Sequence, residues 1–364
     1  MQLHQTDPRW SEQYAEESSR LRTLLGEIPE GGIIENIEHF GATSVPGALA
    51  QPCIDIGLAV WPFPLEPARQ SALEALGYTL VQGHEGAPEQ RFSHADGTFQ
   101  LHVVDSGSEL WTHYIIIRDY LRHDGAALQT YNRRKQEYAE TLPDSASYES
   151  AEADLLHQTL DAARRWWVDY HGFAPVHAVV QELGEFAQPW YISSGWALDL
   201  FLGRVARVHH DVDVVIARSD QISLQAHMTG RGWKFVTPHE GALEPWPPHM
   251  RLEHPRIQAH AHREGAFIDF LLSDIGNAIW HYRRDPVVIR GVERMSLRTP
   301  DGIPFLAPEL VLLFKSKNTS GRDRPKDQGD FDKVRDLLEP ERRAWLRWAL
   351  LRTDPAHPWI AELV

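Results

Sequence analysis

Two aspartates separated by one residue, Asp211 and Asp213, lie at the start of an apolar stretch and have the chemistry to hold a cation. Side chains at positions i and i+2 of a β-strand point to the same face. A strand here would therefore project both carboxylates together and turn Val212 and Val214 toward a core. Mg²⁺ prefers oxygen ligands and is usually held by one or two carboxylates plus phosphate oxygens of a substrate. The pair predicts a catalytic magnesium site.

Two further features supply what phosphoryl chemistry needs beside this pair. Ser194 and Gly195 precede an apolar helical pattern, and small residues at a helix N-terminus let backbone N–H groups approach an anion. Asp269 lies alone in the apolar run Ala266–Leu272, where a carboxylate is costly unless it is paired or bound to a metal. We therefore expect Asp269 to be a third metal ligand or a base, and Ser194 and Gly195 to bind phosphate.

Each feature also has a simpler interpretation. An isolated Asp-x-Asp is most often a solvated strand end, and a buried aspartate such as Asp269 can cap a turn. The pairs His209-His210 and His260-x-His262 offer ligand atoms, but they lack a cysteine or a third partner at suitable spacing, so hydrogen-bonded histidine is favoured over zinc. The order of motifs is more specific: a glycine turn, a helix, an Asp-x-Asp strand, then an apolar strand with one aspartate.

The composition limits the functions that the chain can have. Its 364 residues favour two domains. The net charge of −15 argues against a broad nucleic-acid surface, and the single cysteine, Cys53, excludes an intramolecular disulfide. No apolar run approaches the ~18 residues of a spanning helix, and the N-terminus does not resemble a signal peptide. We expect a cytoplasmic protein without a membrane partner; the oligomeric state is left open.

The periodicity predicts an α+β chain in two halves. In the first half, helices are expected over 10–25, 69–76, 110–122, 126–140 and 152–170, and strands over 33–40, 53–60 and 99–104. The turn-rich stretch Gly41–Gly47 follows the first strand, and Leu142–Ser147 predicts a break. Gly172–Pro175 ends the last helix, which divides the chain into domains of residues 1–171 and 172–364.

The second half starts the same order of elements again. Helices are expected over 176–186, after Gly195, and over 221–231, 307–317 and 331–351, and strands over 190–193, around Asp211 and over 267–272. A glycine turn, an acidic strand and a later strand occur in both halves. We therefore expect two tandem domains, each a small mixed sheet flanked by helices.

The motifs of the second half resemble those of the nucleotidyltransferase superfamily of the DNA polymerase β type. Their residue types and spacing are similar to those of the aminoglycoside and lincosamide nucleotidyltransferases. The similarity is carried by Gly195–Arg204, by Arg207 with His209–Asp213, and by Tyr282–Pro286, Asp301–Glu309, Lys326-Asp327 and Asp330-Phe331. One departure is Ser194, where the family often has glycine; serine is usual in the wider superfamily.

The resemblance implies an adenylyltransferase-like enzyme. Asp211 and Asp213 would hold two Mg²⁺ ions that bridge a nucleoside triphosphate, and Asp269 would complete one metal site or take the proton of an acceptor hydroxyl. Basic residues would stabilise departing pyrophosphate; Lys315 and Arg204 are the nucleotide-binding candidates, although Lys315 could equally lie on a solvated helix face. The expected reaction moves AMP from ATP to a hydroxyl of a small molecule.

The first half resembles the GrpB family, which is also grouped with the nucleotidyltransferases. The similarity covers roughly residues 5 to 168 and is carried by Glu38–Ile56, Phe99–Trp111 and Arg118–Arg122. The resemblance points to Thr43, Ser44, Asp55 and His102 as candidate site residues.

The site of the first half is expected to be the weaker one. Gly57 stands two residues after Asp55, where a second carboxylate would point, and His102 stands where the third would be. Gln51 replaces the usual family lysine and removes a cation that could meet phosphate. We expect weak phosphate binding that depends little on metal, or a purely structural role.

Two alternatives stay open. The weaker first half would suit a non-catalytic nucleotide-binding or regulatory tandem module. A transferase that modifies tRNA or protein is the other, and the acidic composition leans against RNA. The same acidity suits a cationic aminoglycoside, with Glu240, Glu244 and Glu253 as candidates for lining its pocket.

Overall fold

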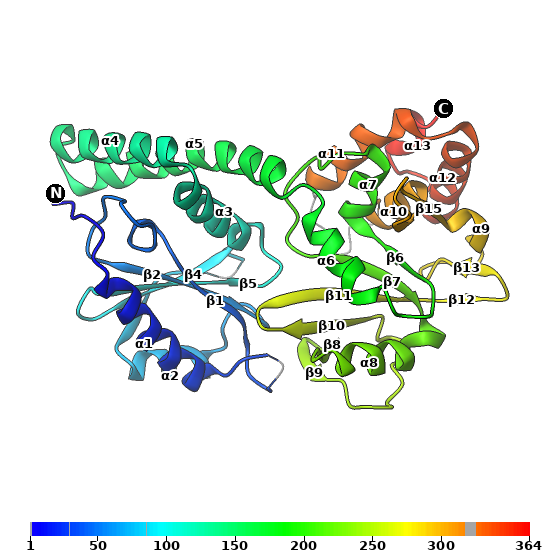
Figure 1. The fold of residues 1–364 in the computed structure, drawn as a ribbon, viewed down its shortest axis with the longest axis horizontal. Helices are drawn as coiled ribbons and strands as arrows, with labels where there is room; N and C mark the ends of the chain where they lie inside the picture. The colour runs from blue at the N-terminus through cyan, green and yellow to red at the C-terminus, as the bar shows by residue number, and fades with distance from the viewer. Residues whose placement is uncertain (1, 29, 85, 317–324) are drawn as a thin grey trace. The chain divides into compact units, whose positions relative to one another are not determined.

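The computed structural model describes residues 2–28, 30–84, 86–316 and 325–364 (Figure 1). They form two compact units. The first is built from residues up to Tyr170 together with the segment His239–Pro245, and the second from the rest of the chain beginning at His171. In the described part of the chain, no helix combines the length and the apolar composition needed to cross a membrane.

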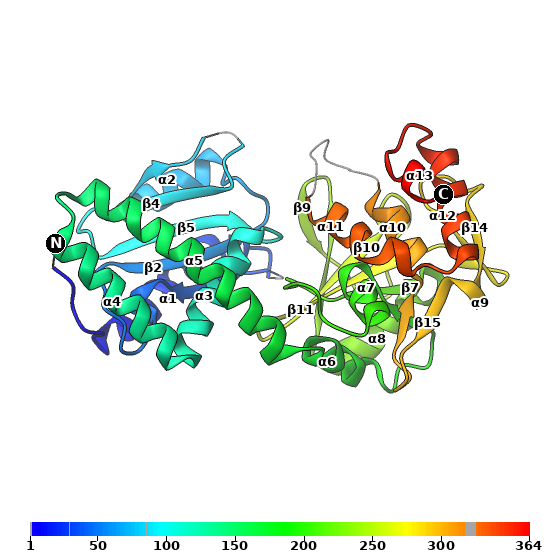
Figure 2. The same ribbon diagram turned by 90° about the horizontal axis from the view of Figure 1, so that it is seen from above.

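The first unit is a five-stranded mixed sheet with helices on both faces. Its strand order is β1-β2-β5-β4-β3, and only the central pair β2 and β5 is parallel. In chain order its elements are α1 (Arg9–Leu25), β1 (Ile34–Phe40), η1 (Ala42–Ser44), β2 (Ile54–Val60), α2 (Pro67–Ala75), β3 (Tyr78–Gln82), β4 (Glu89–His94), β5 (Phe99–Asp105), α3 (Glu109–His123), α4 (Gly125–Thr141) and α5 (Ser145–His171). Helices α1 and α2 cover one face, and α3, α4 and α5 the other (Figure 1, Figure 2).

The main core of this unit lies under α1. Leu21 and Leu25, one turn apart, project from the same side of this helix. They belong to one buried cluster with Ile54, Ile56 and Leu58, which alternate along one face of β2. Because β2 is buried between two neighbouring strands, the side chains at its N-terminal end are held in place by the core beneath them.

The second unit contains seven strands of a mixed sheet, in the order β15-β16-β6-β7-β11-β10-β8, and a separate three-stranded sheet, β12-β13-β14. In chain order the elements that follow α5 are α6 (Ala174–Leu183), β6 (Trp190–Ile192), α7 (Ser194–Leu202), β7 (Asp213–Ala217), η2 (Arg218–Asp220), α8 (Gln221–Gly230), β8 (Lys234–His239), β9 (Ala242–Pro245), β10 (Gln258–Arg263), β11 (Ala266–Ser273), β12 (Ile275–Gly276), β13 (Ile279–His281), β14 (Ile289–Gly291), α9 (Val292–Met295), β15 (Ser296–Arg298), β16 (Pro304–Leu306), α10 (Pro308–Lys315), α11 (Pro325–Val334), η3 (Arg335–Leu337), α12 (Pro340–Thr353) and α13 (Trp359–Glu362). Helix α8 lies on one side of the large sheet, and α10 and α11 on the other (Figure 1).

Five neighbouring strands have the same arrangement in both units. The order β6-β7-β11-β10-β8 repeats β1-β2-β5-β4-β3. The corresponding pairs also share their sense, because β7 with β11, like β2 with β5, is the parallel pair. The prediction of an α+β chain with two tandem mixed sheets flanked by helices is confirmed.

Several predicted element boundaries are wrong. The break predicted over Leu142–Ser147 ends early, because the carboxylate of Asp144 accepts a hydrogen bond from the backbone N–H of Ser147 (2.8 Å) and so caps a helix that begins at Ser145. Strands β3, β4, β8, β9, β10 and β12 to β16 were not predicted; polar residues weaken the strand pattern of β4 and β10, and several of the others are only two to four residues long. Helix α10 ends at Lys315, and Lys317, its predicted end, lies outside the described residues.

Candidate active site

Two aspartates of the second unit are direct partners on neighbouring parallel strands, and a third precedes one of them by two residues. Asp213 begins β7 and is the direct partner of Asp269 on β11, so the two side chains share a face of the sheet. Asp211 lies two residues before Asp213. Removal from solvent and the charge of Asp211 together raise the pKa of Asp213 to about 7. This like-charge arrangement is one that a bound cation would relieve.

Asp211 lies outside β7, so the prediction that one strand carries both aspartates is wrong. Strand β6 ends at Ile192, and the last main-chain hydrogen bond on that side runs from the N–H of Ser193 to the carbonyl of Asp213 (2.8 Å). The carbonyl of Asp211 instead accepts a hydrogen bond from the indole N–H of Trp196 (2.8 Å). The main chain at Asp211 is therefore fixed by the side chain of Trp196 and not by the hydrogen bonds of a strand.

The turn that opens α7 faces Asp213. Ser194 has a φ of 51°, and its hydroxyl donates to the carboxylate of Asp213. A Cβ atom at Gly195 would lie 2.4 Å from a guanidinium nitrogen of Arg207 and 2.4 Å from the ring of His209, so only glycine fits there. The two residues predicted to bind phosphate thus lie at the carboxylate site, where the hydroxyl of Ser194 bonds to Asp213.

Lys315 and Arg207 are the two cations whose charges lower the pKa of Asp213, against the effect of burial. Both are bound by acids of α11. The Nζ atom of Lys315 lies 2.8 Å from Asp327 and 2.9 Å from Asp330, and two nitrogens of Arg207 lie 3.2 Å from Asp330. Two positive and two negative side chains therefore form one network beside the carboxylate pair.

Arg204 is not part of this network. It is exposed and follows Gly203, the left-handed C-cap of α7, and Arg207 is the arginine that lies near Asp213. Arg207 was read as part of the family motif without a role. Its position two residues before His209-His210-Asp211 was the available signal.

His260 of β10 lies next to Asp269 on β11. His260 is the strand partner of Asp269, and its Nε2 atom lies 3.8 Å from a carboxylate oxygen. Burial lowers the pKa of His260 to about 3 and that of His262 to about 4, so both rings are neutral at pH 7. His209 is hydrogen-bonded to Asp199 at 2.7 Å.

The donor atoms fit a hard cation that takes further ligands from a substrate. Carboxylate oxygens are the donors that Mg²⁺ prefers. Within residues 2–28, 30–84, 86–316 and 325–364, no group of three or more His, Cys, Asp or Glu side chains is spaced to hold a metal ion by itself. Mg²⁺ held by Asp211 and Asp213 would therefore complete its coordination with phosphate oxygens and water.

In the first unit, Asp55 occupies the position of Asp213. Asp55 is the strand partner of Phe40, the last residue of β1 before the turn. In the same way Asp213 lies opposite Ser193, the residue that precedes α7. In each unit, the turn that follows the first strand of this arrangement therefore begins beside an aspartate.

The neighbours of Asp55 are not carboxylates. Its partner on β5 is Gln100, and Cys53 stands two residues before it. His102 pairs with Gly57, two residues farther along the strands. The predicted register, with Gly57 and His102 in the places of the second and third carboxylates, is therefore wrong by two residues. The first unit lacks two of the three carboxylates of the second.

His102 is buried between two acids. Its Nε2 atom lies 3.1 Å from Asp55 and its Nδ1 atom 2.6 Å from Glu89 of β4. Ionised carboxylates only accept hydrogen bonds, so a doubly protonated ring satisfies both. Burial acts to lower the pKa of His102, but the hydrogen bonds to Asp55 and Glu89 outweigh it and raise that pKa. Glu89 also accepts from the hydroxyl of Tyr114 (2.7 Å) and was missed because β4 was missed.

The hydroxyls of Thr43 and Ser44 are bonded to the end of β1 and within their own turn. Thr43 shares a hydrogen bond with the Nε2 atom of His39 (3.0 Å), and Ser44 donates to the carbonyl of Gly41 (2.7 Å). These bonds stabilise the turn beside Asp55.

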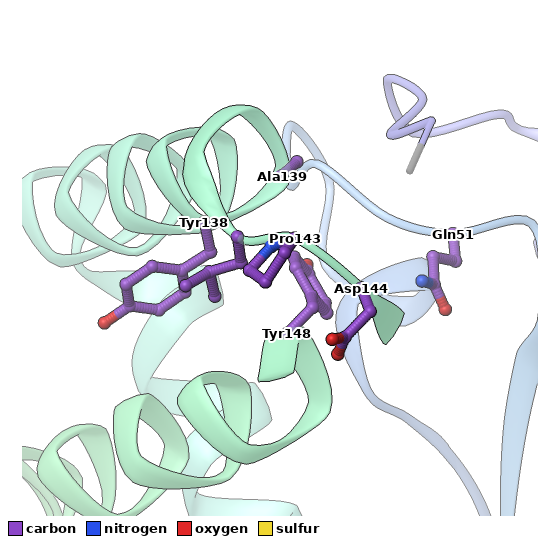
Figure 3. A pocket seen from close by; sticks show the side chains of 7 residues that line it. Gln51, Tyr138, Ala139, Pro143, Asp144 and Tyr148 are labelled. Carbon is purple, nitrogen blue, oxygen red and sulfur yellow. The ribbon is translucent and has the colours of Figure 1, made fainter. Parts of the chain in front are cut away.

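A cavity of about 330 Å³ lies elsewhere in the first unit. Figure 3 shows Gln51 on one side of it and residues of the α4–α5 connection on the other. It is lined by Gln51, Tyr138, Ala139, Leu142, Pro143, Asp144 and Tyr148. None of the candidate site residues lines it, so it is distinct from the Asp55 site.

Two family models match the chain in separate regions. The model described as GrpB protein matches residues 1–162, and the model described as aminoglycoside-2''-adenylyltransferase matches residues 175–254. The second match includes Ser194, Gly195, Asp211 and Asp213. Both resemblances inferred from the motifs are confirmed.

Curated relatives match less than half of the chain. A UPF0157 protein of Halalkalibacterium halodurans is 33% identical over 139 residues, which cover 38% of this chain and 69% of the relative. A UPF0157 protein of Streptomyces coelicolor is 31% identical over 155 residues, which cover 42% and 79%. The glutamate-rich protein GrpB of Alkalihalophilus pseudofirmus is 28% identical over 160 residues, which cover 42% and 89%.

Solved structures show weaker similarity. The conserved protein GrpB from Enterococcus faecalis has a TM-score of 0.39 and 24% identity, and the match covers 44% of this chain and 98% of that one. The antibiotic-resistance factor ANT(2'')-Ia has a TM-score of 0.37 and 16% identity, with coverage of 50% and 92%. Neither likeness is strong enough to add to the family matches. On the identity and coverage of its relatives, the chain belongs, through its first unit, to the GrpB family.

Proposed function

We propose that the second unit is a Mg²⁺-dependent nucleotidyltransferase that moves AMP from ATP to a hydroxyl of a small-molecule acceptor. The observation that carries the proposal is the direct pairing of Asp213 with Asp269, with Asp211 close enough for its charge to act on Asp213. The match of residues 175–254 to the aminoglycoside-2''-adenylyltransferase model supports the class of reaction.

The side chains have separate tasks in this reaction. Bound Mg²⁺ would neutralise triphosphate charge and orient in-line attack at the α-phosphorus. Asp211 and Asp213 would hold it, and their mutual repulsion favours the binding of a cation. Asp269, on the same face, accepts the proton of the acceptor hydroxyl. The acceptor oxygen bonds to the α-phosphorus, the bond to the leaving phosphate breaks, and pyrophosphate departs.

Lys315 and Arg207 favour a negatively charged substrate beside the carboxylates. Both are bound by acids of α11, so their charge is partly neutralised before a nucleotide arrives. Fixed donors of this kind stabilise developing charge without reorganising. The net charge of −15 supports a small and preferably cationic acceptor over a polyanion such as RNA.

The first unit is proposed as a non-catalytic partner of this enzyme. Gln100 and Cys53 stand where the second unit has Asp269 and Asp211. His102 already hydrogen-bonds to Asp55, and the raised pKa of this histidine favours its positively charged form. This unit therefore has neither the ligands nor the uncompensated charge that attract Mg²⁺.

The test is nucleotide transfer by the full chain. Labelled ATP, GTP, CTP and UTP are each incubated with Mg²⁺ and a panel of aminoglycosides and lincosamides, and both label transfer and pyrophosphate are measured. We expect transfer from ATP that is abolished by EDTA and reduced at least ~100-fold in Asp213→Asn. Asp301→Asn, an exposed aspartate of the same unit, is the charge-matched control. Full transfer in folded Asp211→Asn/Asp213→Asn would refute the assignment.

A further inference from the structure

The position of Asp211 depends on a contact from another element. Asp211 lies outside β7, and its carbonyl accepts a hydrogen bond from the Nε1–H of Trp196 in α7 at 2.8 Å. We propose that Trp196 is a positioning residue of the second unit's site, which fixes the main chain of Asp211 and thereby the spacing of the carboxylates. The proposal rests on the proposed function for its metal-binding readout alone.

The indole of Trp196 is itself held on its face. The ring of His209 stacks on it with centroids 4.3 Å apart and planes at 28°. The Nε2 atom of His209 lies 2.7 Å from the carboxylate of Asp199, which follows Trp196 by three residues on the same helix. Asp199 also accepts the N–H of Ala206 (3.1 Å). The helix thus binds the segment before β7 at three points.

These contacts leave little room for displacement. The Trp196 side chain is 1% exposed, and the side chains of His209 and Asp199 are 4% exposed. A Cβ atom on the neighbouring Gly195 would collide with Arg207 and His209 at 2.4 Å, so the turn and the segment before β7 are already in contact. Mg²⁺ demands near-ideal octahedral geometry, so even a small shift of Asp211 reduces affinity.

Trp246 offers a matched control. Its Nε1–H donates to a main-chain carbonyl, that of Met250, at 2.7 Å, and the residue is 4% exposed. Met250 is not a site residue. Replacing either tryptophan by phenylalanine removes the same indole hydrogen bond and keeps an aromatic ring, but only Trp196→Phe releases Asp211.

The experiment compares the full-length wild type, Trp196→Phe and Trp246→Phe. We expect both variants to lower the melting temperature by a similar few degrees, about 2–4 °C. Only Trp196→Phe should speed hydrogen exchange at the amides of residues 208–213, and only it should weaken Mn²⁺ binding in calorimetry, by about tenfold. Equal exchange and equal Mn²⁺ affinity in the two variants would overturn the proposal.

Two further outcomes are also decisive. If Trp196→Phe does not fold, His209→Gln replaces it: this variant keeps the indole N–H but removes the ring stacked on it, and unchanged exchange at residues 208–213 would overturn the proposal. If the wild type neither binds Mn²⁺ nor transfers a nucleotide, the proposed function fails. In that case hydrogen exchange alone decides the role of Trp196.

Discussion

Asp55 and Asp213 occupy the same position in two sheets of the same strand order, but only Asp213 has a carboxylate partner on the neighbouring parallel strand. Asp213 pairs with Asp269, whereas Asp55 pairs with Gln100 and is hydrogen-bonded to His102. The two units thus compensate the same aspartate differently. The second unit leaves negative charge for an external cation, whereas the first unit places a buried histidine of raised pKa against its aspartate.

The first prediction concerns the stability of the second unit and its dependence on pH. The pKa of Asp213 is raised to about 7 in the folded state and lies near 3.9 when unfolded. The folded state therefore binds more protons between these values, and stability without metal falls as pH rises from about 4 to 7, by on the order of 2 to 4 kcal/mol. Thermal unfolding in EDTA from pH 4 to 8 measures this loss.

Mg²⁺ and Asp213→Asn should each reverse that loss. Saturating Mg²⁺ should raise the melting temperature at pH 8 more than at pH 5, because a cation binds the ionised pair. Asp213→Asn should be at least as stable as the wild type at pH 8 without metal and should not respond to Mg²⁺. An Asp301→Asn control retains the wild-type pH profile; the same flattening in both variants would contradict the prediction.

The second prediction concerns His102, whose pKa is raised by Asp55 and Glu89 against burial. Its stabilisation is complete below pH 6.5, the usual histidine pKa, and is lost as pH rises through the higher folded value. Hydrogen exchange at the amides of β4 and β5, followed from pH 6 to 9 and corrected for intrinsic rates, should show protection decreasing in this window.

Substitution of His102 separates this effect from general alkaline destabilisation. His102→Asn leaves Glu89 buried beside a neutral side chain, so we expect a loss of about 3 kcal/mol and protection that no longer changes between pH 6 and 9. His94→Asn is the control, because the partner of His94, Asp96, is exposed. A wild-type pH dependence in His102→Asn would exclude His102 as its source.

The third prediction is that the first unit binds phosphate weakly and without metal. Calorimetry with ATP uses the full chain carrying Asp211→Asn and Asp213→Asn, so that the second site is disabled. Any remaining binding should be equal with and without Mg²⁺, since Gln100 and Cys53 do not replace the missing carboxylates. Tight Mg²⁺-dependent binding that disappears on addition of Asp55→Ala would make both units candidate enzymes.

The fourth prediction is that the two units fold separately. Only Gly172 and Phe173 lie between α5 and α6, and Gly172 has a positive φ of 50°. Limited proteolysis should cleave near residues 171–176 and leave two compact fragments, each with its own thermal transition. A single cooperative transition with cleavage at the termini alone would indicate one fused unit.

Apolar periodicity in the sequence located the apolar strands of both sheets, whether central or at an edge, but not the polar strands. β2 is a continuous apolar run apart from Asp55 and was predicted within one residue. β4 has Glu89, Gln90 and Arg91 where an apolar alternation would be needed, so it was missed, together with the acid that binds His102. Apolar periodicity does not detect β4, because its buried side chains form polar hydrogen bonds where a core strand would have apolar ones.

The candidate carboxylates of the second unit could be predicted from their spacing, whereas the contacts that position them could not. The pairing of Asp213 with Asp269 depends on strand register, and the start of β7 depends on where β6 ends. The bond from Trp196 to the carbonyl of Asp211 joins residues fifteen positions apart. Such contacts are set by tertiary packing, which local spacing does not encode.

The repeated strand order also makes misassembly possible while this chain folds. Two sheets with the same order in one polypeptide can exchange strands, and misassembly of this kind is characteristic of proteins with repeated domains. In the second unit β16 pairs with β6, whereas β1 is the outer strand of its sheet and is bridged at Ile34 by Glu27. β1 carries Glu35 and Glu38 and an irregular register between Ile34 and Asn36. Charges and bulges on an edge discourage further pairing, so Glu35 and the irregular register of β1 disfavour pairing of the first sheet with strands of the second.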